Sequence, residues 1–313
     1  MCVNPIKCWQ YYETDSLTGE EKTHLVFNIN KTSFNKDKDY SVEQKLEDLY
    51  IPGRNQKLYN RRIKPITLPC GKCPDCLMKY SLEWAYRIMN EASYYAENCF
   101  MTLTYANTNG ELCLKDIQNF LKRLRKKISP LKIRFFNCGE YGSKGKRPHF
   151  HCIIFGWCPS DLKFLKKTKK GQIIYTSEIV SSLWKHGFVS IGNVEFESAK
   201  YTALYMQKLH KFPDKKVQPF LTMSNRPGIG YKYVLDKKNT LLLTDKVYNN
   251  GKDIPLPRYY LKVLENQQYC DTSTLRVNRE KKKDLILEEE NVRAYKLAKY
   301  DKLLHWKLEK GDT

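Results

Sequence analysis

Residues 146–156 read KRPHFHCIIFG and place two histidines one residue apart at the head of an apolar run. Successive side chains of a β-strand alternate between the faces of its sheet, so His149 and His151 are expected to point the same way. Neutral imidazole is a common ligand of divalent metals, and the pattern therefore predicts a metal site with open positions. The alternative is two strand histidines that bind nothing.

Residues 131–140, LKIRFFNCGE, contain β-branched and aromatic side chains, and several turn-forming residues follow them. This pattern predicts a hairpin whose first strand ends at Glu140. If Glu140 faces the histidines, its carboxylate joins them, whereas a shift of one residue would turn it away. The sequence leaves this register open, and a solvated glutamate is the alternative. We call Glu140, His149 and His151 the Glu-His-His cluster.

Residues 197–211, ESAKYTALYMQKLHK, lack glycine and proline and predict a helix. Tyr201, Tyr205 and Lys208 then share one face, because they fall at positions i, i+4 and i+7. A phenol is a poor nucleophile near neutral pH because its ordinary pKa is about 10. A neighbouring cation can activate it by stabilising the phenolate. The alternative is an amphipathic helix with tyrosines half buried against a sheet.

Three ordered segments, FMTLTY (100–105), CGEYGSKGKRPHFH (138–151) and YTALYMQK (201–208), resemble the motifs of the HUH endonucleases that start rolling-circle replication. The segments NPIKCW, PCGKCPDC, FLKRLRKKI, LWKHGFVSIGNVEFESAKY and MSNRPGIG resemble replication initiators of the Microviridae, specifically the gokushovirus branch. The resemblance runs to about residue 265 and leaves out the charged tail.

The resemblance implies an α+β fold, the HUH endonuclease fold, with helices packed on an antiparallel sheet like that of a ferredoxin or an RNA-recognition domain. It implies that the Glu-His-His cluster holds Mg²⁺ or Mn²⁺. Tyr205 would be the first nucleophile, Tyr201 would make a second cleavage, and Lys208 would stabilise the developing charge. The implied reaction is strand-specific nicking and rejoining of DNA at the phage origin through a covalent 5′-phosphotyrosine. A nonenzymatic DNA-binding protein and a metal-dependent nuclease that uses water are the alternatives.

The net charge of +21, from 55 Lys and Arg against 34 Asp and Glu, predicts a polyanionic partner. The resemblance implies that this partner is single-stranded and supercoiled circular phage DNA. No apolar run approaches the roughly 20 residues of a membrane span, and no signal peptide follows Met1, which predicts the cytoplasm of the bacterial host. The sequence lacks a Gly-x-x-x-x-Gly-Lys-Ser/Thr loop, so a host helicase and polymerase are expected partners.

The resemblance implies DNA contacts from the strand at 99–105, and further contacts are expected from the basic surface of an amphipathic helix at 114–128 and from arginines in turns. A core strand, a solvated charged surface and a rigid loop are the respective alternatives. The residues are Thr102, Thr104, Tyr105, Arg123, Lys126, Arg147 and Arg226.

Eleven cysteines, an odd number without an export signal, predict reduced thiols. Cys70, Cys73 and Cys76 form two adjoining Cys-x-x-Cys spacings, which suit thiolate coordination of a structural Zn²⁺. Cys2 or Cys8 could supply a fourth ligand. Three cysteines at the entry to a helix are the alternative, and iron–sulfur ligation is another.

The remaining pattern predicts three regions. Residues 1–98 hold the cluster of Cys70, Cys73 and Cys76 and a helix at 74–98, residues 99–212 form the nuclease core, and residues 213–313 form an extension with a charged helical tail at 281–308. The first 69 residues show little periodicity, and segments 28–48 and 51–62 are expected to be mobile or to contact DNA. In the core, the order strand, helix, strand, strand, helix, strand, helix predicts a sheet on one side and helices on the other. A short helix is expected at 256–265.

Overall fold

The protein is described by a computed structural model that covers residues 5–14, 19, 21–26, 62–107, 110–142, 147–168, 171–204, 217–249, 251–267, 271–275 and 277–279. The chain divides into two compact units, Met1–Cys76 and Leu77–Thr313. The division into regions 1–98, 99–212 and 213–313 stays a prediction.

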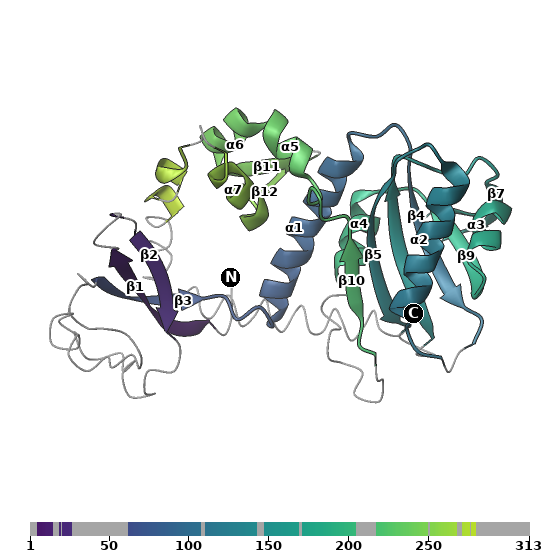
Figure 1. The fold of residues 1–313 in the computed structure, drawn as a ribbon, viewed down its shortest axis with the longest axis horizontal. Coiled ribbons are helices and arrows are strands. Elements are labelled where there is room, and N and C mark those ends of the chain that lie inside the picture. Colours follow the sequence, from purple (N-terminus) through teal and green to yellow (C-terminus); the bar gives the residue numbers. More distant parts are fainter. Residues whose placement is uncertain are drawn as a thin grey trace. The chain divides into compact units, whose positions relative to one another are not determined.

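The first unit contains a three-stranded antiparallel sheet in the order β2-β1-β3 (Figure 1). The strands are β1 (Ile6–Thr14), β2 (Glu21–Val26) and β3 (Arg62–Leu68). The expectation of an irregular N-terminal region was therefore wrong for these segments. Pro65 lies in β3, and an edge strand tolerates proline because one of its sides needs no hydrogen-bond donors. Segments 28–48 and 51–61 lie outside the described residues.

The second unit is built on a seven-stranded sheet in the order β10-β5-β6-β4-β9-β8-β7. Each neighbouring pair is antiparallel, which confirms the predicted α+β class. The strands are β4 (Asn98–Tyr105), β5 (Arg134–Tyr141), β6 (Pro148–Phe155), β7 (Lys163–Lys167), β8 (Ile173–Thr176), β9 (Gly187–Gly192) and β10 (Phe220–Met223). The pair β7 and β8 was not expected, because the sequence around it reads as polar and basic.

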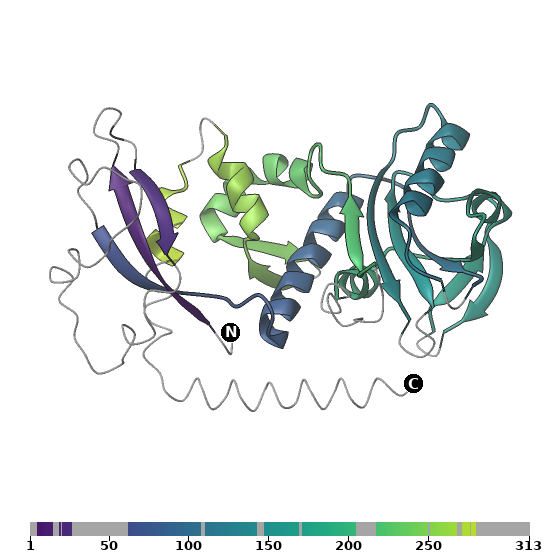
Figure 2. The ribbon, with the colours of Figure 1, turned by 60° about the horizontal axis from the view of Figure 1, so that its bottom comes forward.

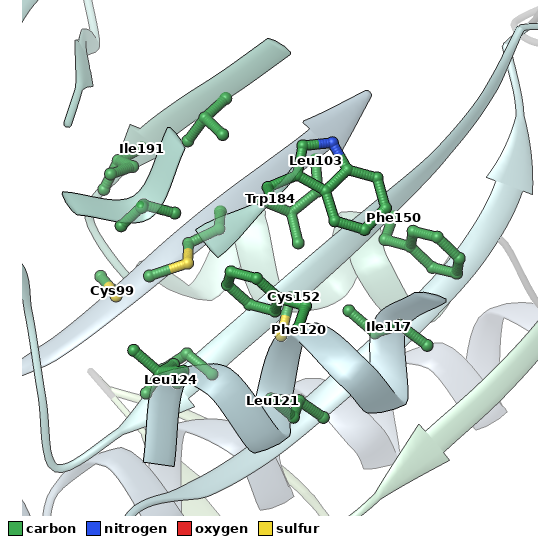
Figure 3. Close-up of a cluster of buried hydrophobic side chains, with 14 of the residues drawn as sticks. Cys99, Leu103, Ile117, Phe120, Leu121, Leu124, Phe150, Cys152, Trp184 and Ile191 are labelled. Atoms are coloured by element: carbon green, nitrogen blue, oxygen red, sulfur yellow. The ribbon is translucent and has the colours of Figure 1, made fainter. Parts of the chain in front are cut away.

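Helices cover both faces of this sheet, so the expectation of helices on one side only was wrong. On one face, which we call the α2 face, helices α2 (Leu114–Ile128) and α3 (Glu178–Leu183) bury Phe120, Leu124 and Val180 against the sheet. Figure 3 shows Phe120 and Leu124 in this layer. On the other, the α1 face, helices α1 (Pro74–Ala92) and α4 (Phe196–Leu204) pack on the strands (Figure 2). The apolar run of β6 is buried from Phe150 to Phe155, as a strand covered on both sides requires.

Helix α1 is shorter than the predicted 74–98. It ends at Ala92, and the Asn98 side-chain amide donates hydrogen bonds to the carbonyl oxygens of Ala92 and Tyr95, each at 3.1 Å. These bonds fix the chain between the end of the helix and Asn98. Asn98 can then begin β4 instead of extending the helix.

The remaining elements of the second unit bury a third apolar cluster that includes Tyr86 of α1 and Tyr260. They are α5 (Tyr231–Asp236), α6 (Lys238–Thr244), β11 (Lys246–Asn249), β12 (Lys252–Pro255) and α7 (Arg258–Glu265). Helix α7 confirms the helix predicted at 256–265. The charged tail at 281–308 lies outside the described residues. None of the helices in the described part of the chain has the length and apolar character needed to cross a bilayer.

Gly187, at the start of β9, should be the residue of this sheet least tolerant of a side chain. Its φ is +154°, and an added Cβ would lie 2.4 Å from both the Ala106 nitrogen and the Thr104 oxygen. We expect Gly187→Ala to lower the free energy of unfolding by about 2–4 kcal/mol. Gly192→Ala in the same strand is the control, because its Cβ would meet only Ile174 Cδ1 at 3.5 Å. Equal midpoints of urea denaturation for the two variants would contradict this account.

Candidate active site

The Glu-His-His cluster forms because β5 and β6 pair with Glu140 directly opposite His149. Directly opposed residues of an antiparallel pair point to the same face, so the carboxylate meets both imidazoles on the α1 face. Glu140 Oε1 lies 2.7 Å from His149 Nε2 and 3.2 Å from His151 Nε2, and the two Nε2 atoms are 3.2 Å apart. The register that the sequence left open is the one that assembles the cluster.

The hydrogen bonds around His149 show what these atoms require. His149 Nδ1 lies 3.0 Å from the carbonyl oxygen of Arg147, which can only accept, so Nδ1 carries the proton. In the neutral ring Nε2 then carries a lone pair, which faces the carboxylate oxygen of Glu140. These two acceptor atoms, 2.7 Å apart, repel each other unless a proton lies between them or a metal ion binds both. The donor set therefore fits a metal ion.

The spacing of the three donor atoms also suits a metal. Their mutual separations of 2.7–3.2 Å match one face of an octahedron, whose edge is about 3.0 Å for metal–ligand bonds of 2.1 Å. Glu195 and Glu197, the two carboxylates just before Tyr201 in the sequence, are exposed and lie outside the cluster. Among the described residues, these three can hold a metal ion on the sheet.

Burial and charge act against each other at Glu140, whose residue is 1% exposed. Burial raises the pKa of the carboxyl group, but its interactions with His149 and His151 outweigh burial and leave the pKa below the ordinary value. The hydroxyl of Thr102 lies 3.1 Å from Nδ1 of His151. The Phe100 ring stacks on the same imidazole, with ring centroids 5.5 Å apart. The carboxylate is thus charged and the second imidazole is held in place.

Helix α4 brings a phenol to the cluster. The ring of Tyr201 meets the ring of His151 edge to face, with centroids 5.3 Å apart. Partial burial raises the pKa of the Tyr201 phenol, and the negative charge on Glu140 raises it further. A phenol whose pKa is raised stays protonated near neutral pH. Tyr205 and Lys208, the other predicted members of this helix face, lie outside the described residues.

The three residues predicted from the first motif separate between the two faces of the sheet. Thr102 and Thr104 pair with His151 and His149 and lie on the α1 face with the cluster. Tyr105 packs on the α2 face, where its hydroxyl donates to Asp116 at 2.8 Å. Alternation along β4 makes this separation unavoidable.

The predicted basic residues are not gathered at the cluster. Helix α2, with Arg123 and the exposed Lys126, lies on the α2 face, and Arg123 Nε donates to the Leu183 carbonyl. Arg226 is exposed beyond β10, toward the end of the sheet opposite Glu140. Arg147 contributes its backbone carbonyl, as described above, a role that no side-chain pattern in the sequence reveals.

A second group of metal-binding side chains lies in the first unit. The sulfur atoms of Cys70, Cys73 and Cys76 lie within 4.8 Å of one another, and this group can also hold a metal ion. The Cys73 amide donates to the Cys70 sulfur at 3.3 Å. Cys8 is buried in β1 and is not part of the group, and Cys2 lies outside the described residues.

The chain is similar to known proteins across the segment that contains the cluster. A family model for replication-associated proteins of the ORF2 type matches residues 98–210, the span from β4 through α4 that holds the cluster. Replication-associated protein VP4 of Bdellovibrio phage phiMH2K is 33% identical over 222 residues, which are 66% of this chain and 70% of that protein.

Two further relatives are similar. Replication-associated protein ORF2 of Spiroplasma virus 4 is 34% identical over 64% of this chain and 68% of its own length. Replication-associated protein ORF4 of Chlamydia phage 1 is 32% identical over 63% of this chain and 53% of its own length. No solved structure matches the chain.

Removing the carboxylate should weaken metal binding. We expect Glu140→Gln, which keeps the shape of the side chain but removes its charge, to weaken Mn²⁺ binding in isothermal titration at least about tenfold. His186→Ala is the control, because this histidine lies beside Asp116 and away from the cluster. Equal affinities for the wild type and Glu140→Gln would show that the cluster is not the Mn²⁺ site.

Proposed function

The chain belongs to the replication-associated proteins of Microviridae-type phages, and from this premise we propose that it initiates rolling-circle replication by nicking and rejoining one strand of the phage DNA at its origin. The observation that carries the proposal is the contact between Tyr201 and His151. It brings a nucleophile of the type this reaction needs to a group of three metal-binding side chains.

The reaction would be a transesterification at phosphorus. Glu140, His149 and His151 would hold Mg²⁺ or Mn²⁺, which when bound would polarise the scissile phosphate and neutralise developing charge. The tyrosine oxygen attacks phosphorus and loses its proton, the bond from phosphorus to the 3′ oxygen breaks, and a 5′-phosphotyrosine forms. The released 3′ hydroxyl can prime synthesis. One phosphodiester replaces another, so the strand can be rejoined without ATP.

The two tyrosines would have different roles. Tyr205, three residues before Lys208, is our first nucleophile, because it matches the Tyr-x-x-Lys pattern of the HUH motif. Tyr201 would attack after one round of copying and release a unit-length circle by strand transfer. Burial and the negative charge on Glu140 both raise the pKa of the Tyr201 phenol, so a cation bound at the cluster would favour its ionisation.

The partners follow from this function. The substrates would be single-stranded and supercoiled circular phage DNA, in keeping with the net charge of +21. We place the reaction in the cytoplasm of the bacterial host, where a host helicase would unwind the duplex and a host polymerase would extend the 3′ hydroxyl.

We also propose that Cys70, Cys73 and Cys76 bind a structural Zn²⁺. Thiolates in a tetrahedral zinc site with bonds of 2.3 Å lie about 3.8 Å apart, and the three sulfurs are within 4.8 Å of one another. The amide of Cys73 already donates to the Cys70 sulfur, and Gly71, with φ of +70°, turns the chain between these two residues. Cys76 lies in the first turn of α1, where the helix dipole favours a thiolate.

The tyrosine assignment is tested by recovering the DNA-linked peptide. With Mn²⁺ and overlapping single-stranded oligonucleotides from the genome that encodes the chain, mass spectrometry should find DNA attached to Tyr205. Tyr205→Phe should lower adduct formation by at least about 10³-fold. Tyr201→Phe should still form the first adduct but should not release circles.

The alternatives give different results in the same assay. A nuclease that uses water would cleave undiminished in the doubly substituted Tyr201→Phe, Tyr205→Phe variant. A nonenzymatic DNA-binding protein would cleave nothing in the wild type. Either result would end the proposal of covalent transfer.

Zinc is tested by metal analysis of the full chain. After dialysis against EDTA, plasma mass spectrometry should find about one zinc per chain, and Cys73→Ser should lose it. Cys113→Ser is the matched control, because this cysteine is exposed and outside the group. The measurement is repeated in Glu140→Gln so that zinc held by the Glu-His-His cluster is not counted. Zinc that persists in Cys73→Ser, or iron in its place, would rule out the zinc site.

A further inference from the structure

Two rows of side chains lead from the Glu-His-His cluster across the α1 face. Strand pairing places Glu140, His149, Thr104 and Phe188 in one row. The neighbouring row runs from His151 through Thr102 to Ser190 and is therefore parallel to the first. Residues paired in this way point to the same face, so the rows join the cluster to strand β9.

The helices of the α1 face leave the β9 end of these rows open. Helices α1 and α4 cover Phe136 and Ile153, which lie farther along β5 and β6. Phe188 is 63% exposed, whereas its neighbour Val189, which points to the α2 face, is buried. Single exposed apolar residues are common on proteins, so exposure alone would mean little. The exposure of Phe188 is informative because this residue lies in the same row as Glu140 and His149.

The backbone holds Phe188 in place. Gly187, which precedes it, packs so closely on β4 that an added Cβ would meet Thr104 and Ala106 at 2.4 Å. The Ala106 amide also donates to the carbonyl of His186 at 2.8 Å. Phe188 therefore projects from a fixed strand rather than from a loop, as a rigid contact surface requires.

The side chains between Phe188 and the cluster suit a nucleic-acid strand. Three half-buried hydroxyl residues lie there: Thr102, Thr104 and Ser190. Their side chains are short, so a nucleic-acid strand can approach the sheet, and they can donate hydrogen bonds to phosphate oxygens. Within these two rows, Glu140 is the only acidic side chain. Phe188 lies two strands from His149, or about 10 Å at the usual strand spacing, a distance that a few nucleotides span.

We propose that Phe188 is a base-stacking residue that positions single-stranded DNA on the α1 face, with the strand running over Thr104 toward the Glu-His-His cluster. The inference rests on the proposed function, whose substrate strand it places. The ring offers a π surface without hydrogen-bonding groups, so it would hold a base next to the cleavage site regardless of sequence. Recognition of the origin sequence would then fall to other residues.

The test measures DNA binding without chemistry. Full-length protein in EDTA is titrated into a fluorescein-labelled oligothymidylate, and fluorescence anisotropy gives the dissociation constant. Phe188→Ala should bind roughly five- to tenfold more weakly. Phe188→Tyr should bind as the wild type does, and Phe188→Leu should be as weak as Phe188→Ala, because leucine keeps apolar area but has no π surface. The salt dependence of binding should not change, because no phosphate contact is lost.

Phe164→Ala is the matched control. Phe164 is 67% exposed in β7 of the same sheet, but it pairs with Tyr175, which packs on the α2 face. Its substitution should leave binding unchanged. Full binding by Phe188→Leu, or equal losses in Phe188→Ala and Phe164→Ala, would overturn the stacking role.

Nicking by the same proteins in Mn²⁺ separates the two proposals. If the wild type forms the tyrosine adduct but Phe188→Ala binds DNA normally, the stacking inference fails and the proposed function stands. If the wild type forms no adduct, the proposed function fails, and the binding series still decides whether Phe188 contacts a single strand.

Discussion

The pairing of β5 with β6 is the constraint on which the rest of this structure depends. It sets Glu140 opposite His149, and alternation along β6 adds His151 to the same small volume. Because the His149 ring uses its Nδ1 proton on the Arg147 carbonyl, its other nitrogen meets the carboxylate as a second acceptor. A buried arrangement of this kind is unfavourable without a cation, and this is why the hairpin fits a metal ion.

The two faces of the sheet in the second unit differ in how completely helices cover them. The α2 face is closed by an apolar cluster of α2, α3 and four strands, and it makes the sheet rigid (Figure 3). The α1 face is closed only in part, and α4 there brings Tyr201 against His151. A reactive group on one face needs a stable layer behind it, because a shift of about 1 Å can cost a catalytic site most of its rate.

Charge at the site couples the phenol to the cluster. The charge on Glu140 is stabilised by two imidazoles, yet the same charge disfavours ionisation of Tyr201. A cation bound by the cluster would remove this opposition, so metal binding and activation of the tyrosine would be linked. The basic residues of α2 lie on the opposite face and therefore take no part at the cluster.

Local periodicity in the sequence was enough to predict that His149 and His151 share a face, that residues 114–128 form a helix with those bounds, and that the strand ending near Glu140 forms a hairpin with the histidine strand. These features depend on neighbours a few residues apart. The register of Glu140, the contact of Tyr201 with His151, the two helical layers and the separation of Tyr105 from Thr104 were decided only by tertiary structure. Strand pairing and helix packing join residues distant in the chain, and a shift of one residue, which the local pattern permits, would reverse which side chains meet.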